Sequence, residues 1–306
     1  MIPLESEGLL LVNKPSGPTS HDIVDGVRRA TGLRRVGHAG TLDPLASGLL
    51  PLVLGRATRL VRFLPDAPKT YVGTFRLGRT TDTDDRAGEI TSEHTGPLPA
   101  PEQVEAAARE LERRRLQLPP AYSARRVKGR RLYELARKGV PVDAAPAEVR
   151  VTRFEPSRTA EPGTYEFLAE VSAGTYIRGL VRDLGRDLGC GGVLESLIRT
   201  IIGPLRLEDA LPWTPQAPPE KARVLQALIP VERMPLAPPP LALVDAAAAH
   251  RFTRGGSLAP PGEAPDSGLV RVLAAEGVLL GIGEIRDGRL RPKVVIAPSS
   301  GSPSER

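Results

Sequence analysis

Proline and glycine divide this chain of 306 residues into short patterned segments. The sequence holds 32 prolines and 31 glycines, and the prolines gather around residues 97–101, 212–219, 235–240 and 259–265. Proline has no backbone N–H and a fixed φ angle, so clusters of it interrupt helices and central strands. We interpret the clusters as rigid loops and domain boundaries.

Composition narrows the class of protein. Hydrophobic residues make up 40% and charged residues 25% of the chain, as in ordinary globular proteins. Apolar runs such as 48–54 are too short to cross a bilayer, and the acidic N-terminus does not resemble a signal peptide, so the cytoplasm is the expected compartment. Cys190 is the single cysteine, which excludes an internal disulfide, and four scattered histidines without an HExxH pair favour no metal site.

Hydrophobic periodicity predicts a mixed α+β fold. Helices are expected at 19–32, 58–64, 101–116, 132–138 and 176–188, and strands at 8–14, 69–77, 149–154 and 164–172. Residues 196–202 fit either a helix or a strand. Short runs at 241–244, 269–274, 278–285 and 293–297 predict a small all-β module at the C-terminus. With few crossover-length helices, a mixed, largely antiparallel sheet with flanking helices is favoured over a doubly wound one.

Basic residues are unevenly distributed. The net charge is only +6, but seven basic residues and one acid lie between Arg125 and Lys138. Several clusters of this kind favour a surface that binds phosphates, although each cluster alone is also typical of a solvated helix face. The chain lacks a P-loop, a complete dinucleotide-binding glycine motif and a GxSxG nucleophile motif.

The segment from Gly37 to Gly48 is the strongest candidate for chemistry. Its glycines allow unusual backbone angles, and Pro44 keeps Asp43 out of the helical region. A lone carboxylate on a stiff loop beside leucines is a candidate nucleophile or base. The residues alone leave open that Asp43 merely caps a following helix.

Four motifs together resemble one enzyme family. They are LLVNKPSGPTSHDIV with GHAGTLDPLASGLLPL (residues 10–24 and 37–52), KTY with LGRTTDTD (69–71 and 77–84), PPAYSA with YELAR (119–124 and 133–137), and GTYIR with DLG (174–178 and 183–185). Their order and spacing are similar to those of bacterial tRNA pseudouridine synthases that modify uridine 55 of the T-loop. Arg126 stands where lysine is frequent in that family, and Ile198 where many members have a second arginine.

The resemblance implies a catalytic group of three side chains. Asp43 would be the essential carboxylate acting on the ribose, Arg178 would pair with it, and Tyr71 would stack on the extruded uracil. Such a reaction would need neither a cofactor nor a metal. His38 would fill the gap left in the RNA loop, and Leu197 would line the uracil pocket. Other substrate-binding residues are expected at Lys14, Gly40, Tyr176, Arg126 and Lys128.

The resemblance also implies a domain organisation and a partner. Residues 1–232 would form the catalytic domain, with a basic insertion at about 98–145 that grips the T-stem loop of tRNA. Residues 238–300 would form a small β-barrel-like RNA-binding module of the PUA type, and 301–306 a disordered tail. The expected protein is a monomer without an obligate protein partner or a membrane association.

Two other functions remain open at this point. One is a pure RNA-binding or chaperone protein whose isomerase is inactive. The other is a synthase that acts on ribosomal or small nuclear RNA within a guide complex. A chain without basic tails favours the stand-alone enzyme over the guide complex.

Overall fold

A large mixed sheet organises most of the molecule. The structure, a computed structural model, describes residues 7–123, 125–127, 130–132, 145–242 and 246–296. Ten strands form this sheet, whose main order is β11-β12-β4-β13-β3-β1-β15. Their bounds are β1 (Gly8–Lys14), β2 (Val36–His38), β3 (Ser47–Leu54), β4 (Lys69–Leu77), β11 (Val151–Arg158), β12 (Thr164–Val171), β13 (Gly192–Ile202), β14 (Leu205–Arg206), β15 (Leu211–Pro212) and β16 (Leu228–Pro230). Two pairings, β1 with β15 and β3 with β13, are parallel, and the others are antiparallel.

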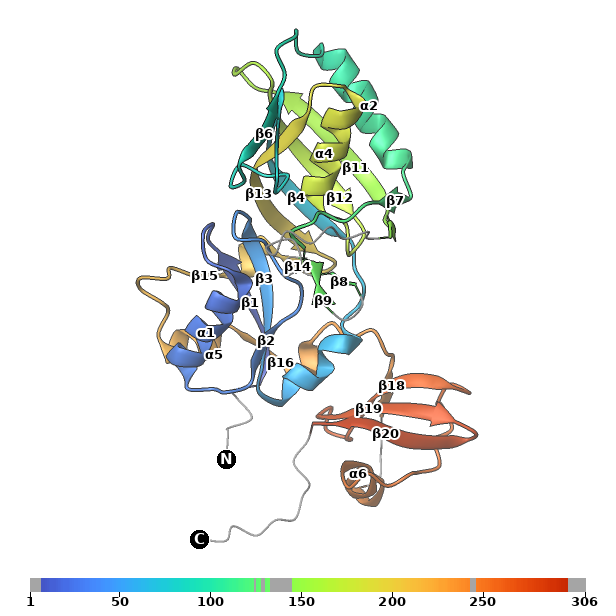
Figure 1. The fold of residues 1–306 in the computed structure, drawn as a ribbon. Coiled ribbons are helices and arrows are strands. Elements are labelled where there is room, and N and C mark those ends of the chain that lie inside the picture. The colour runs from blue at the N-terminus through green and yellow to red at the C-terminus, as the bar shows by residue number, and fades with distance from the viewer. Residues whose placement is uncertain (1–6, 124, 128–129, 133–144, 243–245, 297–306) are drawn as a thin grey trace.

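Helices and small ribbons flank the sheet. The helices are α1 (Ser20–Thr31), α2 (Pro101–Arg113), α4 (Ile177–Asp187) and α5 (Lys221–Gln226), with 3-10 helices η2 (Gly55–Phe63), η3 (Leu207–Asp209) and η4 (Val231–Arg233). The ribbons are β5 (Arg79–Thr81) with β6 (Ile90–Glu93), β7 (Leu116–Gln117) with β10 (Ala147–Glu148), and β8 (Arg126–Val127) with β9 (Arg130–Arg131). In Figure 1, α2 and α4 lie beside the part of the sheet that contains β4, β11, β12 and β13, while α1 and α5 lie beside β1 and β3.

The apolar run at the start of the chain becomes a strand buried on both faces. Leu10 and Val12 of β1 belong to one hydrophobic core, and Leu9 and Leu11 belong to a second. Side chains alternate along a strand, so a strand between two cores must be apolar at every position. The helix expected at 19–32 is confirmed as α1, which begins at a capping box formed by Thr19 and ends at Gly32 in the left-handed conformation.

The C-terminal unit is a four-stranded sheet with a helix. Its strands are β17 (Pro240–Ala242), β18 (Gly268–Leu273), β19 (Leu279–Arg286) and β20 (Arg289–Val295), and α6 (Ala246–Thr253) packs against β19 and β20. The expected small β module is confirmed, but it is not all-β. The alanine-rich segment from residue 246 forms a helix, which buries Phe252 in the core of this unit.

This C-terminal sheet shares a hydrophobic core with the large sheet. Leu279 and Ile282 of β19 pack in the same buried cluster as Leu9 and Leu11, while Leu280 and Ile285 face the core under α6. Figure 1 shows β18, β19 and β20 beside the end of the large sheet from which η2 emerges. The two sheets are thus joined by apolar packing in addition to the connecting chain.

Several expectations change in detail. Residues 196–202 form part of β13, because β13 pairs with β4 along one edge and with β3 and β14 along the other. Helix α2, the first part of the expected RNA-gripping insertion, buries Val104, Ala108 and Leu111 in the main core. The expected helix at 132–138 and the tail at 301–306 fall largely or wholly outside the described residues. Among the described helices, none is long and apolar enough to cross a membrane.

The shared core predicts that the two sheets unfold together. Ile282 is 0% exposed, so Ile282→Ala should lower the free energy of unfolding by about 2–4 kcal/mol. Val278, which is 42% exposed on the same unit, provides the control, and Val278→Ala should change it by no more than about 0.5 kcal/mol. Urea unfolding followed by circular dichroism measures both values. A separate early transition, shifted alone by Ile282→Ala, would contradict the shared core.

Candidate active site

Asp43 lies on a loop fixed to the sheet from several sides. The loop joins β2 to β3. The Ser20 hydroxyl donates to the Leu42 carbonyl oxygen and accepts from the Leu42 N–H, each at 2.9 Å. The Gly17 N–H donates to the Pro44 oxygen at 2.8 Å, and Leu42 is buried in the main core. Since a strand and not a helix follows this loop, Asp43 is not a helix cap.

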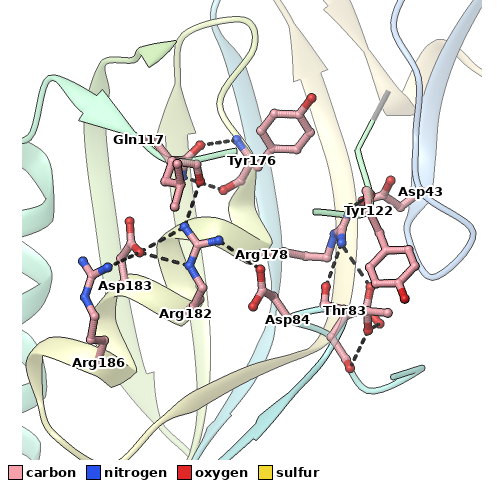
Figure 2. A network of polar contacts seen from close by, with 12 residues as sticks. Asp43, Thr83, Asp84, Gln117, Tyr122, Tyr176, Arg178, Arg182, Asp183 and Arg186 are labelled. Atoms are coloured by element: carbon pink, nitrogen blue, oxygen red, sulfur yellow. Dashed lines mark hydrogen bonds and ion pairs between the residues drawn. The ribbon is translucent and has the colours of Figure 1, made fainter. Parts of the chain in front are cut away.

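Arg178 forms an ion pair with the Asp43 carboxylate and fixes its direction. Its Nε donates to Oδ2 of Asp43 at 2.8 Å, and its other nitrogens donate to the backbone oxygens of Thr83 at 2.7 Å and Tyr122 at 3.0 Å. The Arg178 side chain is 4% exposed and that of Asp43 37% exposed. The guanidinium is therefore fixed by three loop segments, as Figure 2 shows, while the 37% exposure of Asp43 leaves its carboxylate open to a substrate.

Helix α4 places Arg178 beside Asp43, because hydrogen bonds fix the backbone at the start of the helix. The Gln117 side chain accepts from the Tyr176 N–H and donates to the Tyr176 carbonyl, both at 2.9 Å. Gln117 is 2% exposed and lies on β7, far away in the sequence. Figure 2 shows Gln117 facing the Tyr176 backbone at the start of the helix that carries Arg178.

Acidic residues surround the arginines of α4. Asp85 Oδ2 lies 3.7 Å from Arg178 Nε, and Asp84 Oδ2 lies 3.1 Å from Arg182 Nη1. Burial raises the pKa of Asp84, and the charges of Arg182 and Arg178 oppose that effect. Asp183 continues this network by pairing with Arg182 at 3.1 Å. Ion pairs thus link α4 to the loop after β5, where Asp84 has the left-handed conformation. These pairs fix both sides of the site.

A cavity of about 210 Å³ opens beside Asp43 and brings together five of the expected residues: Asp43, Tyr71, Tyr176, Arg178 and Leu197. Tyr71 and Leu197 are 6% and 7% exposed, so they form its walls. His38 and Gly40 lie instead on a neighbouring cavity of about 310 Å³, which shares Thr41 and Lys69 with the first. The residues expected to bind the substrate are thus divided between two adjoining cavities.

Lys14 has a different position from the one expected of a substrate ligand. It is 0% exposed, and its ammonium donates to the carbonyl oxygens of Pro15 and Pro18 at 2.8 Å and of Pro44 at 3.4 Å. Burial lowers the pKa of Lys14 to about 8, and the charge of Asp43 opposes the shift. Lys14 therefore supports the loop that carries Asp43 from beneath and, contrary to our expectation, does not line the cavity.

Sequence reasoning missed two cations beside the cavity, Arg199 and Lys69. Arg199 is 1% exposed, and burial lowers its pKa, against a hydrogen bond with Tyr71 and the charge of Asp43. Burial also lowers the pKa of Lys69, on the wall that both cavities share. A charged residue within the apolar run 197–202 was the available signal for Arg199. The Arg126 side chain and all of Lys128 lie outside the described residues.

No group of three or more possible metal ligands occurs among the His, Cys, Asp and Glu residues that the structure describes. Asp43 lines the cavity, Asp84 and Asp85 pair with arginines of α4, and each of the three carboxylates lies within 4 Å of an arginine nitrogen. The arrangement therefore presents one oriented carboxylate, an aromatic wall and several buried cations.

Comparisons with known proteins agree on the family. Residues 28–177 match "TruB family pseudouridylate synthase (N terminal domain)", and residues 239–296 match "Pseudouridine synthase II TruB, C-terminal". A protein of Acaryochloris marina named "tRNA pseudouridine synthase B" is 44% identical over 94% of this chain and 98% of its own. The chain belongs to the TruB family. A second member, from Thermobifida fusca and with the same name, is 39% identical over 96% of this chain and all of its own.

Solved structures confirm the α+β fold of this TruB member. One structure, "Crystal Structure of a Cbf5-Nop10-Gar1 Complex", has a TM-score of 0.69 at 24% identity and covers 97% of this chain and 88% of its own. Another, "Structure of H/ACA RNP bound to a substrate RNA containing 2'-deoxyuridine", has a TM-score of 0.66 at 24% identity, with coverages of 96% and 86%. The resemblance identified from the motifs around Asp43 is confirmed by the family match and by the relatives named tRNA pseudouridine synthase B.

The buried ammonium of Lys14 predicts a pH-dependent stability. Between its folded pKa of about 8 and the ordinary value of 10.5, the unfolded chain keeps a proton that the folded protein has lost. Stability therefore rises with pH in this window. Relative to Lys14→Met, the wild-type free energy of unfolding should increase by about 2 kcal/mol between about pH 7.5 and 9.5. Urea titrations across this range measure the difference, and a difference that does not change with pH would contradict the assignment.

The double hydrogen bond of Gln117 predicts a loss of stability on substitution. Gln117→Leu leaves the N–H and carbonyl of Tyr176 without their partner and should cost about 2 kcal/mol. Gln103 offers a matched control, because its side chain accepts one hydrogen bond, from the Ala100 N–H, at the exposed start of α2. Gln103→Leu should cost about 1 kcal/mol or less. Equal decreases in the free energy of unfolding of the two variants, measured by chemical denaturation, would contradict a special role for the hydrogen bonds to Tyr176.

Proposed function

We propose that this protein isomerises uridine 55 in the T-loop of tRNA to pseudouridine without a cofactor. The observation that carries the proposal is Asp43 itself, half-exposed at the cavity and directed by the buried guanidinium of Arg178 at 2.8 Å. Membership of the TruB family and relatives named tRNA pseudouridine synthase B support the reaction and the substrate.

The proposed reaction rearranges one nucleotide and leaves its composition unchanged. The bond between N1 of uracil and C1′ of the ribose breaks, and a bond between C5 and C1′ forms. The proton leaves C5, and N1 gains one, so the reaction needs neither an oxidant nor a second substrate. This chemistry requires a carboxylate near the sugar and a pocket in which the detached base can turn.

Each cavity residue has a proposed role in that sequence. Asp43 acts on the ribose as the glycosidic bond breaks, and Arg178 fixes the direction of its carboxylate. Tyr71 and Leu197 enclose the uracil, since both are buried cavity walls. His38 lies beside the neighbouring cavity, where it can occupy the space that the extruded base leaves in the RNA loop. Tyr176 closes the cavity next to Arg178.

We also propose how the chain divides between chemistry and RNA binding. Residues 1–232 form the catalytic domain and 238–300 a PUA-like RNA-binding module. Because α2 packs into the main core, the RNA-gripping part of the 98–145 segment follows α2 and includes the basic stretch from Arg125 to Lys138. Positive charges on such a segment neutralise phosphates of the T-stem. Arg126, Lys128 and Gly40 remain proposed contacts to the RNA, and the enzyme is proposed to act as a cytoplasmic monomer.

The stand-alone enzyme is preferred over a member of a guide complex. Relatives that match nearly the whole chain at 39–44% identity are named for tRNA. The solved structures whose titles mention protein partners are 24% identical and are similar in fold.

Replacement of Asp43 tests the function directly. Asp43→Asn keeps the shape of the side chain but removes its charge, and it should abolish pseudouridine formation on an unmodified tRNA transcript. Mapping the modified nucleotide should locate the wild-type product at position 55. The affinity for tRNA, measured by filter binding, should change by less than about threefold, because the phosphates supply most RNA affinity.

Asp209→Asn serves as the matched control, because Asp209 is exposed on η3, outside the cavity. This variant should keep the wild-type rate. Product at another position would refute the T-loop assignment. Unchanged turnover by Asp43→Asn would refute the role of Asp43, and an inactive wild type that still binds tRNA would favour the chaperone function.

A further inference from the structure

We propose that Arg199 is a positioning residue that holds the catalytic loop and Tyr71 in one fixed arrangement. The inference rests on the proposed function, because it assigns to Arg199 the geometry between the carboxylate and the wall of the uracil pocket. It concerns the same cavity but a residue outside the motif that carries Asp43.

The Arg199 side chain grips the catalytic loop on both sides of Asp43. Its Nη2 donates to the Gly40 carbonyl oxygen at 3.0 Å and its Nη1 to that of Thr41 at 3.3 Å, both before Asp43. Its Nε donates to the Leu49 carbonyl oxygen at 2.8 Å, after Asp43. One planar guanidinium thus connects the two ends of the loop.

The backbone of Arg199 is fixed between the same two elements. On one edge of β13, Arg199 pairs in parallel with Gly48, where the catalytic loop ends. On the other edge, it is the antiparallel register partner of Tyr71 on β4. Arg199 is therefore the cross-strand link between the carboxylate's loop and the aromatic wall.

The absence of a side chain at Gly48 lets β3 approach the Arg199 backbone of β13 closely. Gly48 has φ of +97°, and a Cβ there would lie 2.4 Å from the Arg199 carbonyl oxygen. A side chain at residue 48 would force β3 and β13 apart. The loop end therefore sits against the Arg199 backbone while the Arg199 side chain reaches past it to residues 40 and 41.

Arginine suits this position better than other cations. Its guanidinium has five N–H donors in a rigid plane and can serve several acceptors that diverge from one another. No salt bridge links Arg199 to a carboxylate among the described residues, so carbonyl oxygens and Tyr71 surround a charge that is 1% exposed. Burial of such a charge is costly, and the role proposed for it is to hold the loop and Tyr71 together.

Geometry at this point bears on the rate more than on RNA affinity. The Arg199 side chain is 1% exposed and donates its hydrogen bonds to carbonyl oxygens of the loop, so its loss should leave most phosphate contacts intact. A displacement of about 1 Å between reacting groups is enough to slow a reaction by about 100-fold. Arg199 should therefore affect the chemical step selectively.

The experiment compares Arg199→Met and Arg199→Lys with a control arginine. Arg76→Met lies on β4, the strand of Tyr71, but its side chain is 40% exposed and pairs with Glu161 at the surface. Single-turnover rates come from tritium released from C5 of labelled uridine in tRNA, and dissociation constants come from filter binding of pseudouridine-containing tRNA.

Arg199→Met should reduce the single-turnover rate by about 100-fold and Arg199→Lys by about 10-fold, with dissociation constants within about threefold of wild type. Arg76→Met should match the wild type in both. Partial recovery by lysine is expected because an ammonium keeps the charge but cannot reach all three carbonyls. An unchanged rate, or a rate loss fully explained by weaker tRNA binding, would overturn the proposal.

A double-mutant cycle keeps the test decisive if Arg199→Met does not fold. Tyr71→Phe keeps the aromatic ring and removes the hydroxyl whose interaction with Arg199 opposes the lowering of the Arg199 pKa. If the two residues act as one unit, the rate loss in Tyr71→Phe/Arg199→Lys should be smaller than the product of the single losses. Independent, multiplicative losses would contradict the link. A wild type that releases no tritium would instead refute the proposed function itself.

Discussion

The short parallel pairing between β3 and β13 is the joint on which the active site depends. Its register partners are Ile198 with Ser47 and Arg199 with Gly48, and it connects the half of the sheet built on β1 and β3 to the half built on β4, β11 and β12. The catalytic loop enters β3 at this joint, and Tyr71 lies on the next strand across β13. A shift of the joint would move Asp43 and Tyr71 relative to each other, because they belong to different halves.

Buried cations stabilise the arrangement around that joint. Lys14, Arg178 and Arg199 each donate hydrogen bonds to backbone carbonyl oxygens of loops that would otherwise have several conformations. They approach the Asp43 loop from beneath, from α4 and from β13 respectively. Loop carbonyls thus receive donors that a regular element would have supplied.

The C-terminal sheet contributes to the same framework through packing. Its strand β19 has two buried faces, one toward α6 and one toward the apolar face of β1 and β3. Arg59 of η2 also donates a hydrogen bond to the Val295 carbonyl oxygen of β20 at 2.6 Å. An RNA-binding module attached in this way would present its surface at a fixed position relative to the cavity.

Local patterns in the sequence determined the positions of most elements and identified the loop that carries Asp43. The helix pattern at 19–32, the alternation along β4 and the motif from Gly37 to Gly48 are properties of adjacent residues, so they could be interpreted without a structure. Arg178 was also found before the structure, through its motif.

Tertiary structure alone decided which partners the charged side chains have. Lys14 resembled a substrate ligand in the sequence, yet its ammonium lies against Pro15, Pro18 and Pro44, and Arg199 showed its importance only when β13 placed it between Gly48 and Tyr71. The shared core between the two sheets was likewise invisible. Periodicity reports which face of an element is buried, but the residues it is buried against come from distant parts of the chain.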